Sequence, residues 1–367
     1  MILYDPDLIQ AYTDYGIMLP ISPARAPRII DFLDHSGVLA SEPLKPLFDS
    51  PTARRFLGDP TPLHREDLER VHQKEFITTL YQEGPEGSQG LLKALLNTYE
   101  LIDRRGRPHR YEPDRAVKPL LELFHLTLAQ VEGTYLACRL ALEKDPKPGF
   151  CYYLGGGMHH ARYDQGAGFC LINDIMIAAR KLQYENRVQR IWVVDLDAHK
   201  GCGTAELVYF SRIRGDLGGN TGLEIANLSI HMAKGWPLDG ETLHAAPQGR
   251  APWIQGDVEI CIEAGAEDTY ISELQRGLAL LEKGSQNLHP DLVIVVDGSD
   301  PYEHDELPSS SLLKLSLDGC IERDRLVYQY LREQGIPSAW IIAGGYGERA
   351  WEPNAYFLRT LQGGGQR

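Results

Sequence analysis

Two carboxylates and one imidazole alternate along the segment Asp195-Leu196-Asp197-Ala198-His199. The segment follows an apolar run, 190–194, which is typical of a buried β-strand. Residues i, i+2 and i+4 of an extended chain point to the same face, so the three polar side chains would lie side by side where the strand ends. Such groups are costly to bury unless they bind a metal or one another. The spacing indicates a site of this kind, the alternative being a strand that ends in an exposed acidic loop.

Three further segments place polar or glycine-rich residues directly after an apolar run. They are 155–160, with the sequence Gly-Gly-Gly-Met-His-His; 297–301, Asp-Gly-Ser-Asp-Pro; and 344–347, Gly-Gly-Tyr-Gly. The strands of a parallel sheet point their carboxyl ends to the same edge, which is where open α/β sheets bind ligands. We therefore expect all four segments to converge, although they are far apart in the sequence.

The elements that must position these segments follow from the apolar pattern. Strand-like runs occur at 150–154, 190–194, 225–230, 291–296 and 338–343. Segments with helical spacing separate most of them: one apolar face recurs between Leu171 and Leu182, and 118–144 is long enough for several turns. This alternation predicts an α/β fold whose parallel sheet is covered by helices on both faces.

Composition and the positions of glycine and proline predict the structure of the remaining segments. We expect short helices at 28–33 and 66–81, a surface loop or short linker at 82–90, and further loops at 212–222 and 233–252. The tail, from about residue 360 and above all 363–367, is expected to be disordered. Without an internal repeat, residues 1–367 are interpreted as one domain.

Composition excludes several classes of function. A formal net charge of −14 argues against a dedicated nucleic-acid binder, which needs basic clusters to neutralise phosphates. No stretch approaches the ~20 apolar residues that cross a bilayer, and the N-terminus lacks the pattern of a signal peptide, so no membrane partner is expected. The six cysteines form no C-x-x-C pair, which favours neither a disulfide framework nor a thiolate zinc site. These features favour a cytoplasmic protein of undetermined oligomeric state.

Six segments in the same order resemble the motifs of a known family, the zinc-dependent histone deacetylases and acetylpolyamine amidohydrolases. They lie at 155–161, 168–174, 195–199, 227–231, 298–300 and 344–346. The resemblance covers roughly residues 20–355, and the short motif at 195–199 looks nearest to the small eukaryotic and bacterial branch called class IV. It implies the arginase-deacetylase fold, a single open parallel sheet with the active site at the carboxyl ends of its strands.

Two cation sites are expected. Asp197, His199 and Asp300 offer two carboxylates and one imidazole and leave coordination positions for water and a carbonyl oxygen, as catalytic zinc requires. An oxygen-rich set could also hold Fe²⁺ or Co²⁺. The resemblance further implies a structural potassium site, formed by Asp195, Ser229 and the carbonyl groups of Asp197, His199 and Ile230.

The resemblance also assigns the catalytic groups. His160 would be the general base that deprotonates water, and His159, paired with Asp195, would stay charged beside it. Tyr346 would donate its hydroxyl to the oxyanion of the tetrahedral intermediate. A substrate tunnel would be lined by Gly168, Phe169, Trp236 and Leu307.

Two positions depart from the family pattern. Lys200 stands where His or Gln is usual, and Cys202 stands where Asp or Asn usually orients the general base. Because cysteine is a poor hydrogen-bond partner, either His160 is oriented by another group or activity is modest. Three acidic residues after Asp300 either border the pocket mouth, where they would attract cationic substrates, or form a solvated turn; they are Glu303, Asp305 and Glu306.

The resemblance therefore implies a zinc-dependent deacylase that hydrolyses the amide of an acylated amine, such as acetyl-lysine or an acetylpolyamine. One alternative is an arginase-like ureohydrolase, which would need acidic ligands for a second metal. Another is a protein that binds acylated amines but has lost turnover, an idea supported by the substitution at Cys202 alone.

Overall fold

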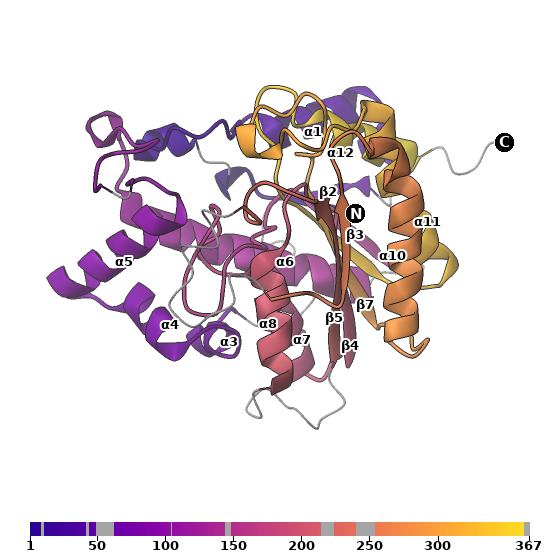
Figure 1. The fold of residues 1–367 in the computed structure, drawn as a ribbon, viewed down its shortest axis with the longest axis horizontal. Helices are drawn as coiled ribbons and strands as arrows, with labels where there is room; N and C mark the ends of the chain where they lie inside the picture. Colours follow the sequence, from indigo (N-terminus) through magenta and orange to yellow (C-terminus); the bar gives the residue numbers. More distant parts are fainter. Residues whose placement is uncertain are drawn as a thin grey trace.

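Eight parallel strands form one sheet at the centre of the computed structural model, which describes residues 1–8, 11–41, 44–48, 62–103, 105–143, 148–213, 224–239 and 254–362. The strand order is β2-β1-β3-β8-β7-β4-β5-β6 (Figure 1). The strands are β1 Ile2–Tyr4, β2 Pro46–Phe48, β3 Phe150–Tyr153, β4 Arg190–Asp195, β5 Glu224–Met232, β6 Val258–Ile262, β7 Leu292–Asp297 and β8 Ser338–Ile342. The predicted parallel α/β sheet is confirmed.

Helices cover both faces of this sheet, as the near-continuous apolar strands predict (Figure 1). One layer comprises α3 Arg65–Glu69, α4 Lys74–Tyr81, α5 Gly84–Thr98, α6 Leu123–Glu143, α7 Asp174–Tyr184 and α8 Cys202–Ile213. The other comprises α1 Arg25–His35, α10 Tyr270–Gly284, α11 Leu317–Glu333 and α12 Glu352–Thr360. Alternate side chains of each central strand enter the two cores. In β4, for example, Ile191 and Val193 face the first layer whereas Trp192 and Val194 face the second.

The register of the sheet places the polar ends of its central strands next to one another. Asp195, at the end of β4, is paired with Ser229 of β5 on one side and with Val296 of β7 on the other. Asp297, at the end of β7, is paired with Ile342 of β8. The segments that follow these strands therefore leave the sheet from the same edge.

Two local predictions are wrong. The helix expected at 66–81 is divided into α3 and α4, because the turn between them is fixed by His72, whose ring contacts the carbonyl group of Arg162 (2.8 Å) and the amide of Asn173 (3.0 Å). The loop expected at 82–90 belongs mostly to α5. Its glycines serve close packing, since a Cβ atom at Gly90 would contact Thr79 of α4 at 2.7 Å.

Three strands were not predicted: β1, β2 and β6. The first two have three residues each, too few to show a period, and they lie together at one end of the sheet with β6 at the other. Of the predicted loops at 212–222 and 233–252, residues 214–222 and 240–252 lie outside the described residues, as does the tail at 363–367.

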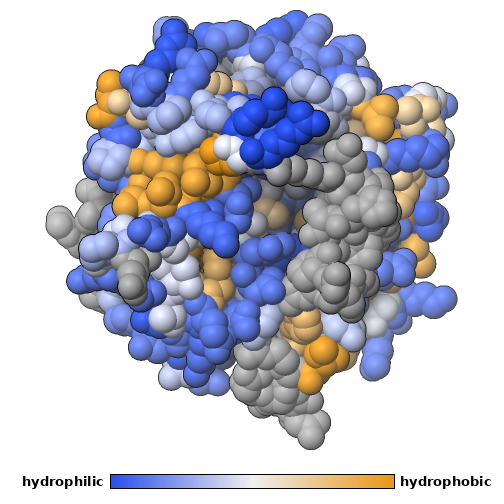
Figure 2. All heavy atoms as spheres, turned by 60° about the vertical axis from the view of Figure 1, so that its left-hand side comes forward, coloured by the Kyte–Doolittle hydropathy of each residue, from blue (hydrophilic) through white to orange (hydrophobic). Residues whose placement is uncertain are grey.

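Figure 2 shows the molecule after a turn that brings the left-hand side of Figure 1 forward. The face seen there is mainly hydrophilic. One apolar patch lies on it beside a hollow. Within the described ranges, the structure contains no helix with the length and apolar character needed to span a membrane.

Candidate active site

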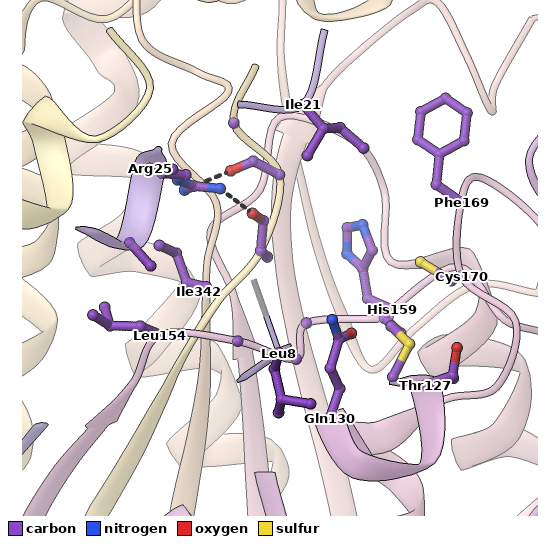
Figure 3. A pocket seen from close by; sticks show the side chains of 18 of the residues that line it. Leu8, Ile21, Arg25, Thr127, Gln130, Leu154, His159, Phe169, Cys170 and Ile342 are labelled. Carbon is purple, nitrogen blue, oxygen red and sulfur yellow. Dashed lines mark hydrogen bonds between the residues drawn. The ribbon is translucent and has the colours of Figure 1, made fainter. Parts of the chain in front are cut away.

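The four segments predicted to converge do so. The loop after β3 brings His159 and His160, the loop after β4 brings Asp197 and His199, and the loops after β7 and β8 bring Asp300 and Tyr346; all but Tyr346 are at most 4% exposed. Together with surrounding residues, most of these side chains line a cavity of about 220 Å³ that continues behind them toward apolar residues (Figure 3). Leu8, Ile21, Leu154 and Ile342 surround this inner part.

Asp197, His199 and Asp300 form a compact set of metal-ligating groups. Each offers one ligand atom, and these atoms lie within 4.8 Å of one another. His199 Nδ1 is 2.8 Å from Asp300 Oδ2 and 3.2 Å from Asp197 Oδ1. Asp300 Oδ2 is buried, and its close contact is with Nδ1 of His199. Buried carboxylate oxygens that converge on an imidazole nitrogen in this way fit a divalent cation.

The charges of these groups show how strongly the cluster attracts a cation. Burial opposes protonation of His199, but the carboxylates of Asp197 and Asp300 outweigh it and raise its pKa to about 10. Burial, and then the negative charge of Asp197, raises the pKa of Asp300 to about 7. Without a metal, bound protons therefore supply the positive charge that balances the two carboxylates of the cluster.

The surrounding loops fix the orientation of these ligands. Ala198 donates its amide to Asp300 Oδ1 (2.9 Å), and Gly344 donates its amide to Asp197 Oδ2 (2.9 Å). The hydroxyl of Ser309 lies 3.2 Å from Nε2 of His199, which leaves Nδ1 directed at the carboxylates. Such partners determine which nitrogen of a histidine can bind a metal. Ser309 was not predicted from the sequence.

His159 and His160 lie in contrasting environments although their ring centres are only 3.8 Å apart. Nδ1 of His159 is 2.7 Å from Asp195 Oδ2. Burial lowers the pKa of His159, but the charges of Asp195 and Asp197 outweigh it and raise the pKa to about 9. The pKa of His160 is well below its usual value because of burial and the positive charges of His159 and His199. At neutral pH the first ring is an imidazolium and the second is neutral.

Cys202 stands in contact with His160, as its position in the motif predicts. Its Sγ is 3.5 Å from Nδ1 of His160, and burial raises the thiol pKa to about 11, so the group is a neutral thiol. The backbone of Lys200 also hydrogen-bonds the His160 ring. The ring of Trp236 contacts it edge-on, with 4.5 Å between the ring centres. The His160 ring is therefore held by several contacts besides the thiol.

Tyr346 carries a buried phenol whose pKa is well above the ordinary value, because of burial and the charges of Asp300 and Asp197. Its backbone is held by Asp305, whose Oδ2 accepts the Tyr346 amide at 2.7 Å. Glu306 likewise accepts the amide of Glu348 at 3.0 Å. These carboxylates therefore hold the loop after β8. None of Glu303, Asp305 and Glu306 lines either described cavity of the site, so these cavities give no support to the alternative that the three residues border the pocket mouth.

A second cavity, of about 110 Å³, leads to His160, His199 and Tyr346. The four residues predicted to form a substrate tunnel all line it: Gly168, Phe169, Trp236 and Leu307. Gly168 has a φ of 52° and lies against Trp236, where a side chain would not fit. Ser309, Glu100 and Arg110 complete the lining and were not predicted, since no motif includes them.

Two residues of the expected potassium site are neighbours in the sheet. Asp195 and Ser229 are paired across β4 and β5, and the hydroxyl of Ser229 is buried without a hydrogen-bond partner. Lys200 extends away from both cavities and pairs with Glu259 of β6, which also contacts His231 Nε2 at 2.7 Å.

Comparison with known proteins agrees with this geometry. A model of the histone deacetylase domain matches residues 19–358, so the chain belongs to that family. It is 33% identical over 217 residues to histone deacetylase 2 of Arabidopsis thaliana, covering 59% of this chain and 48% of the relative. It is 29% identical over 199 residues to the acetoin utilization protein AcuC of Staphylococcus aureus, covering 54% of this chain and 46% of the relative. The chain thus spans about half the length of these two relatives.

Proposed function

We propose that this protein is a metal-dependent deacylase that hydrolyses the amide bond of an acylated amine to a carboxylate and a free amine. One observation carries the proposal: Asp197, His199 and Asp300 form a buried cluster whose ligand atoms lie within 4.8 Å of one another, and His199 lines a narrow cavity. The ligand set favours Zn²⁺, with Fe²⁺ and Co²⁺ as other candidates. We interpret residues 1–367 as one deacetylase-like catalytic domain.

The side chains around the cluster have the properties that amide hydrolysis needs. When bound, the metal supplies Lewis-acid polarisation of the carbonyl group and acidifies water. His160 is neutral and accepts the proton of the attacking water, while the imidazolium of His159 stabilises the negative charge that develops nearby. Tyr346 keeps its phenolic proton and donates a hydrogen bond to the oxyanion. The amine leaves after it receives a proton from the histidine pair.

The substrate would enter with its amine side in the smaller cavity. Phe169 and Trp236 flank that cavity, and the inner cavity behind the metal ligands offers room for the acyl group. The relative named histone deacetylase 2 supports an acetyl group as the first candidate. The orphaned hydroxyl of Ser229 supports the potassium site with Asp195 and the carbonyl groups of Asp197, His199 and Ile230.

The alternatives receive less support. An arginase-like ureohydrolase needs ligands for a second metal, and the part of the chain that the structure describes contains one cluster with suitable geometry. A binding protein without turnover would be expected to lack part of the catalytic set. Here both histidines, the tyrosine and all three ligands lie together.

Metal analysis and chelation test the proposal. The purified protein is expected to bind about one Zn²⁺ per chain and to hydrolyse a fluorogenic acetyl-lysine peptide or acetylspermidine, with activity lost to a chelator and restored by added metal. Asp197→Ala should remain folded but lose both metal and activity. Hydrolysis that survives chelation would contradict the proposal. Two metals per chain would favour a ureohydrolase, and metal binding without turnover would favour a binding protein.

A further inference from the structure

The mouth of the smaller cavity carries two opposite charges. Of the described residues that line this cavity, Glu100 and Arg110 are the only Asp, Glu, Lys or Arg. Arg110 Nη1 is 3.3 Å from Glu100 Oε2, and the two side chains are 32% and 40% exposed. The pair is therefore within reach of both solvent and an entering substrate.

The backbone holds this pair in an uncommon conformation. Glu100, Arg110 and Phe169 have φ values of 54°, 53° and 66°, so three of the six described non-glycine residues with positive φ line one small cavity. Hydrogen bonds enforce the arrangement: Met18 donates its amide to the Arg110 carbonyl (2.8 Å), and Phe169 donates its amide to the Thr98 carbonyl (2.9 Å). Left-handed non-glycine residues persist where the surrounding structure fixes them, and they gather at ligand clamps.

We propose that Glu100 and Arg110 recognise the zwitterionic end of an amino acid, so that the preferred substrate is a free Nε-acyl-lysine or a close homologue. Arg110 would bind the α-carboxylate and Glu100 the α-ammonium group. The proposal rests on the deacylase function above and names the class of acylated amine that this site accepts.

The dimensions of the cavity suit such a substrate. The guanidinium carbon of Arg110 is 6.0 Å from the centre of the Phe169 ring, and that ring centre is 6.3 Å from the centre of the Tyr346 ring. Phe169 therefore lies near both the rim pair and the oxyanion donor. An extended lysine side chain carries its acyl carbonyl about 8 Å from its own α-carbon. The four methylene groups would pass Phe169 while the charged groups remain at the rim.

Charge distinguishes this substrate from the two other obvious classes. An acylated polyamine carries only positive charges, so it would pair with Glu100 and leave Arg110 without a partner. An acyl-lysine within a peptide has no charge at its α-carbon. It would therefore cover Glu100 and Arg110 without offering either of them a charged partner. A free amino acid satisfies both rim charges, and a guanidinium binds a carboxylate through two parallel hydrogen bonds.

Four substrates with the same acyl group and similar length test the proposal: Nε-acetyl-lysine, N-acetylcadaverine, 6-acetamidohexanoate and N-hexylacetamide. We expect kcat/KM to be highest for Nε-acetyl-lysine, with a gain of about 5-fold for each charge at this partly exposed rim. The gain should appear in KM and shrink at high ionic strength. Equal values for all four compounds, or a higher value for N-acetylcadaverine or for a capped acetyl-lysine peptide, would overturn the proposal.

Variants of the pair identify the residues responsible. Arg110→Gln should reduce the preference for Nε-acetyl-lysine over N-acetylcadaverine to one or below, and Glu100→Gln should do the same relative to 6-acetamidohexanoate. Arg110→Lys should keep part of the preference because it keeps the charge. The neighbouring pair Glu112 and Arg115, 2.9 Å apart and outside the cavity, provides matched controls in Glu112→Gln and Arg115→Gln. Equal preferences in Arg110→Gln and Arg115→Gln would contradict the assignment.

A binding measurement separates this inference from the proposed function. Calorimetry of metal-loaded Tyr346→Phe protein with Nε-acetyl-lysine and N-acetylcadaverine reports recognition without turnover. Preferential binding of Nε-acetyl-lysine, combined with wild-type protein that hydrolyses none of the compounds, would refute the deacylase function and leave the rim assignment standing. Turnover of all compounds without preferential binding would refute the rim assignment alone.

Discussion

The residue that contacts the proposed general base is an unusual one. Family resemblance leads us to expect an acid or amide at position 202, and the structure places the Cys202 thiol 3.5 Å from Nδ1 of His160. A neutral thiol is a weak hydrogen-bond partner, so it does little to offset the burial that lowers the pKa of His160. This chain therefore keeps its base neutral and weakly basic.

Replacing the thiol with a carboxylate should change the pH dependence of the reaction. In Cys202→Asp, the new charge beside Nδ1 would stabilise the imidazolium and raise the pKa of His160. As the pH falls, a base with a higher pKa becomes protonated, and stops accepting protons, at a higher pH. The acid limb of the kcat/KM profile should therefore move upward in pH. Cys261→Ser, which changes an exposed cysteine, is the control. A limb that stays in place would show that residue 202 has no influence on the base.

Tyr346 can be tested by removing a single oxygen atom. Tyr346→Phe should keep the metal and bind substrate normally but lower kcat by roughly 10²–10³, the range for loss of one oxyanion donor. The measurement is steady-state kinetics together with metal content. A kcat within about threefold of wild type, which is about 0.6 kcal/mol, would mean that the tyrosine only packs in the cavity wall.

At the scale of elements, a buried ionic cluster on α11 ties the loops after β4 and β7 together. The Arg323 guanidinium is fully buried, pairs with Asp297 (2.7 Å) and Asp324 (2.6 Å), and donates to the carbonyl groups of Leu196 (2.9 Å) and Gly298 (2.8 Å). Leu196 precedes the ligand Asp197, and Gly298 lies two residues before Asp300. The helix thus holds the backbone that presents two of the three proposed metal ligands.

Removing this guanidinium should destabilise the protein strongly. Arg323→Met would leave the carboxylates of Asp297 and Asp324 buried without their cation, a change that costs about 3–5 kcal/mol. Urea unfolding monitored by circular dichroism measures it. Arg325→Met, at an exposed position of the same helix, is the matched control and should change stability by at most about 0.5 kcal/mol. Equal unfolding midpoints for the two variants would contradict the role of Arg323.

Among the elements, the sequence predicts the buried strands most reliably, because burial on both faces gives them a regular apolar pattern. The strands β3, β4, β5, β7 and β8 are covered on both faces, so their apolar runs are nearly continuous and their predicted bounds differ from the observed ones by at most two residues. The sequence predicts a loop at 82–90, where α5 begins, because Gly84, Pro85 and two more glycines lie there. Only contact with α4 shows why glycine is needed there.

The residues of the candidate site also differ in how well the sequence predicts them. Its proposed metal ligands follow the central strands within short motifs, so residue type and spacing indicate them, whereas the roles of His159 and His160 come from the family resemblance. Glu100, Arg110 and Ser309 come from loops without any motif, and their presence at the site depends on how distant segments pack. Asp305 shows the converse: its acidic character was visible, but its hydrogen bond to the Tyr346 backbone was not.

At the scale of the whole molecule, the charged Asp-His-Asp cluster links loops that follow separate strands. His199, from the loop after β4, and Asp300, from the loop after β7, share their protons in the absence of metal, with pKa values of about 10 and about 7. A cation that binds between them must displace these protons, because a protonated ligand cannot coordinate. Metal affinity, protonation and the closeness of the two loops are therefore linked.

This linkage predicts the pH dependence of metal binding. Between pH 7 and pH 9 the metal-free His199 is protonated, so binding releases one proton and affinity should rise about tenfold per pH unit. Below pH 7 Asp300 is protonated as well, so the slope should approach about two decades per unit. Competition with a chelator of known affinity between pH 6 and pH 8 measures the change, and Asp300→Asn, which cannot take up the second proton, should show the single slope throughout. An affinity independent of pH would mean that these two side chains do not hold the metal.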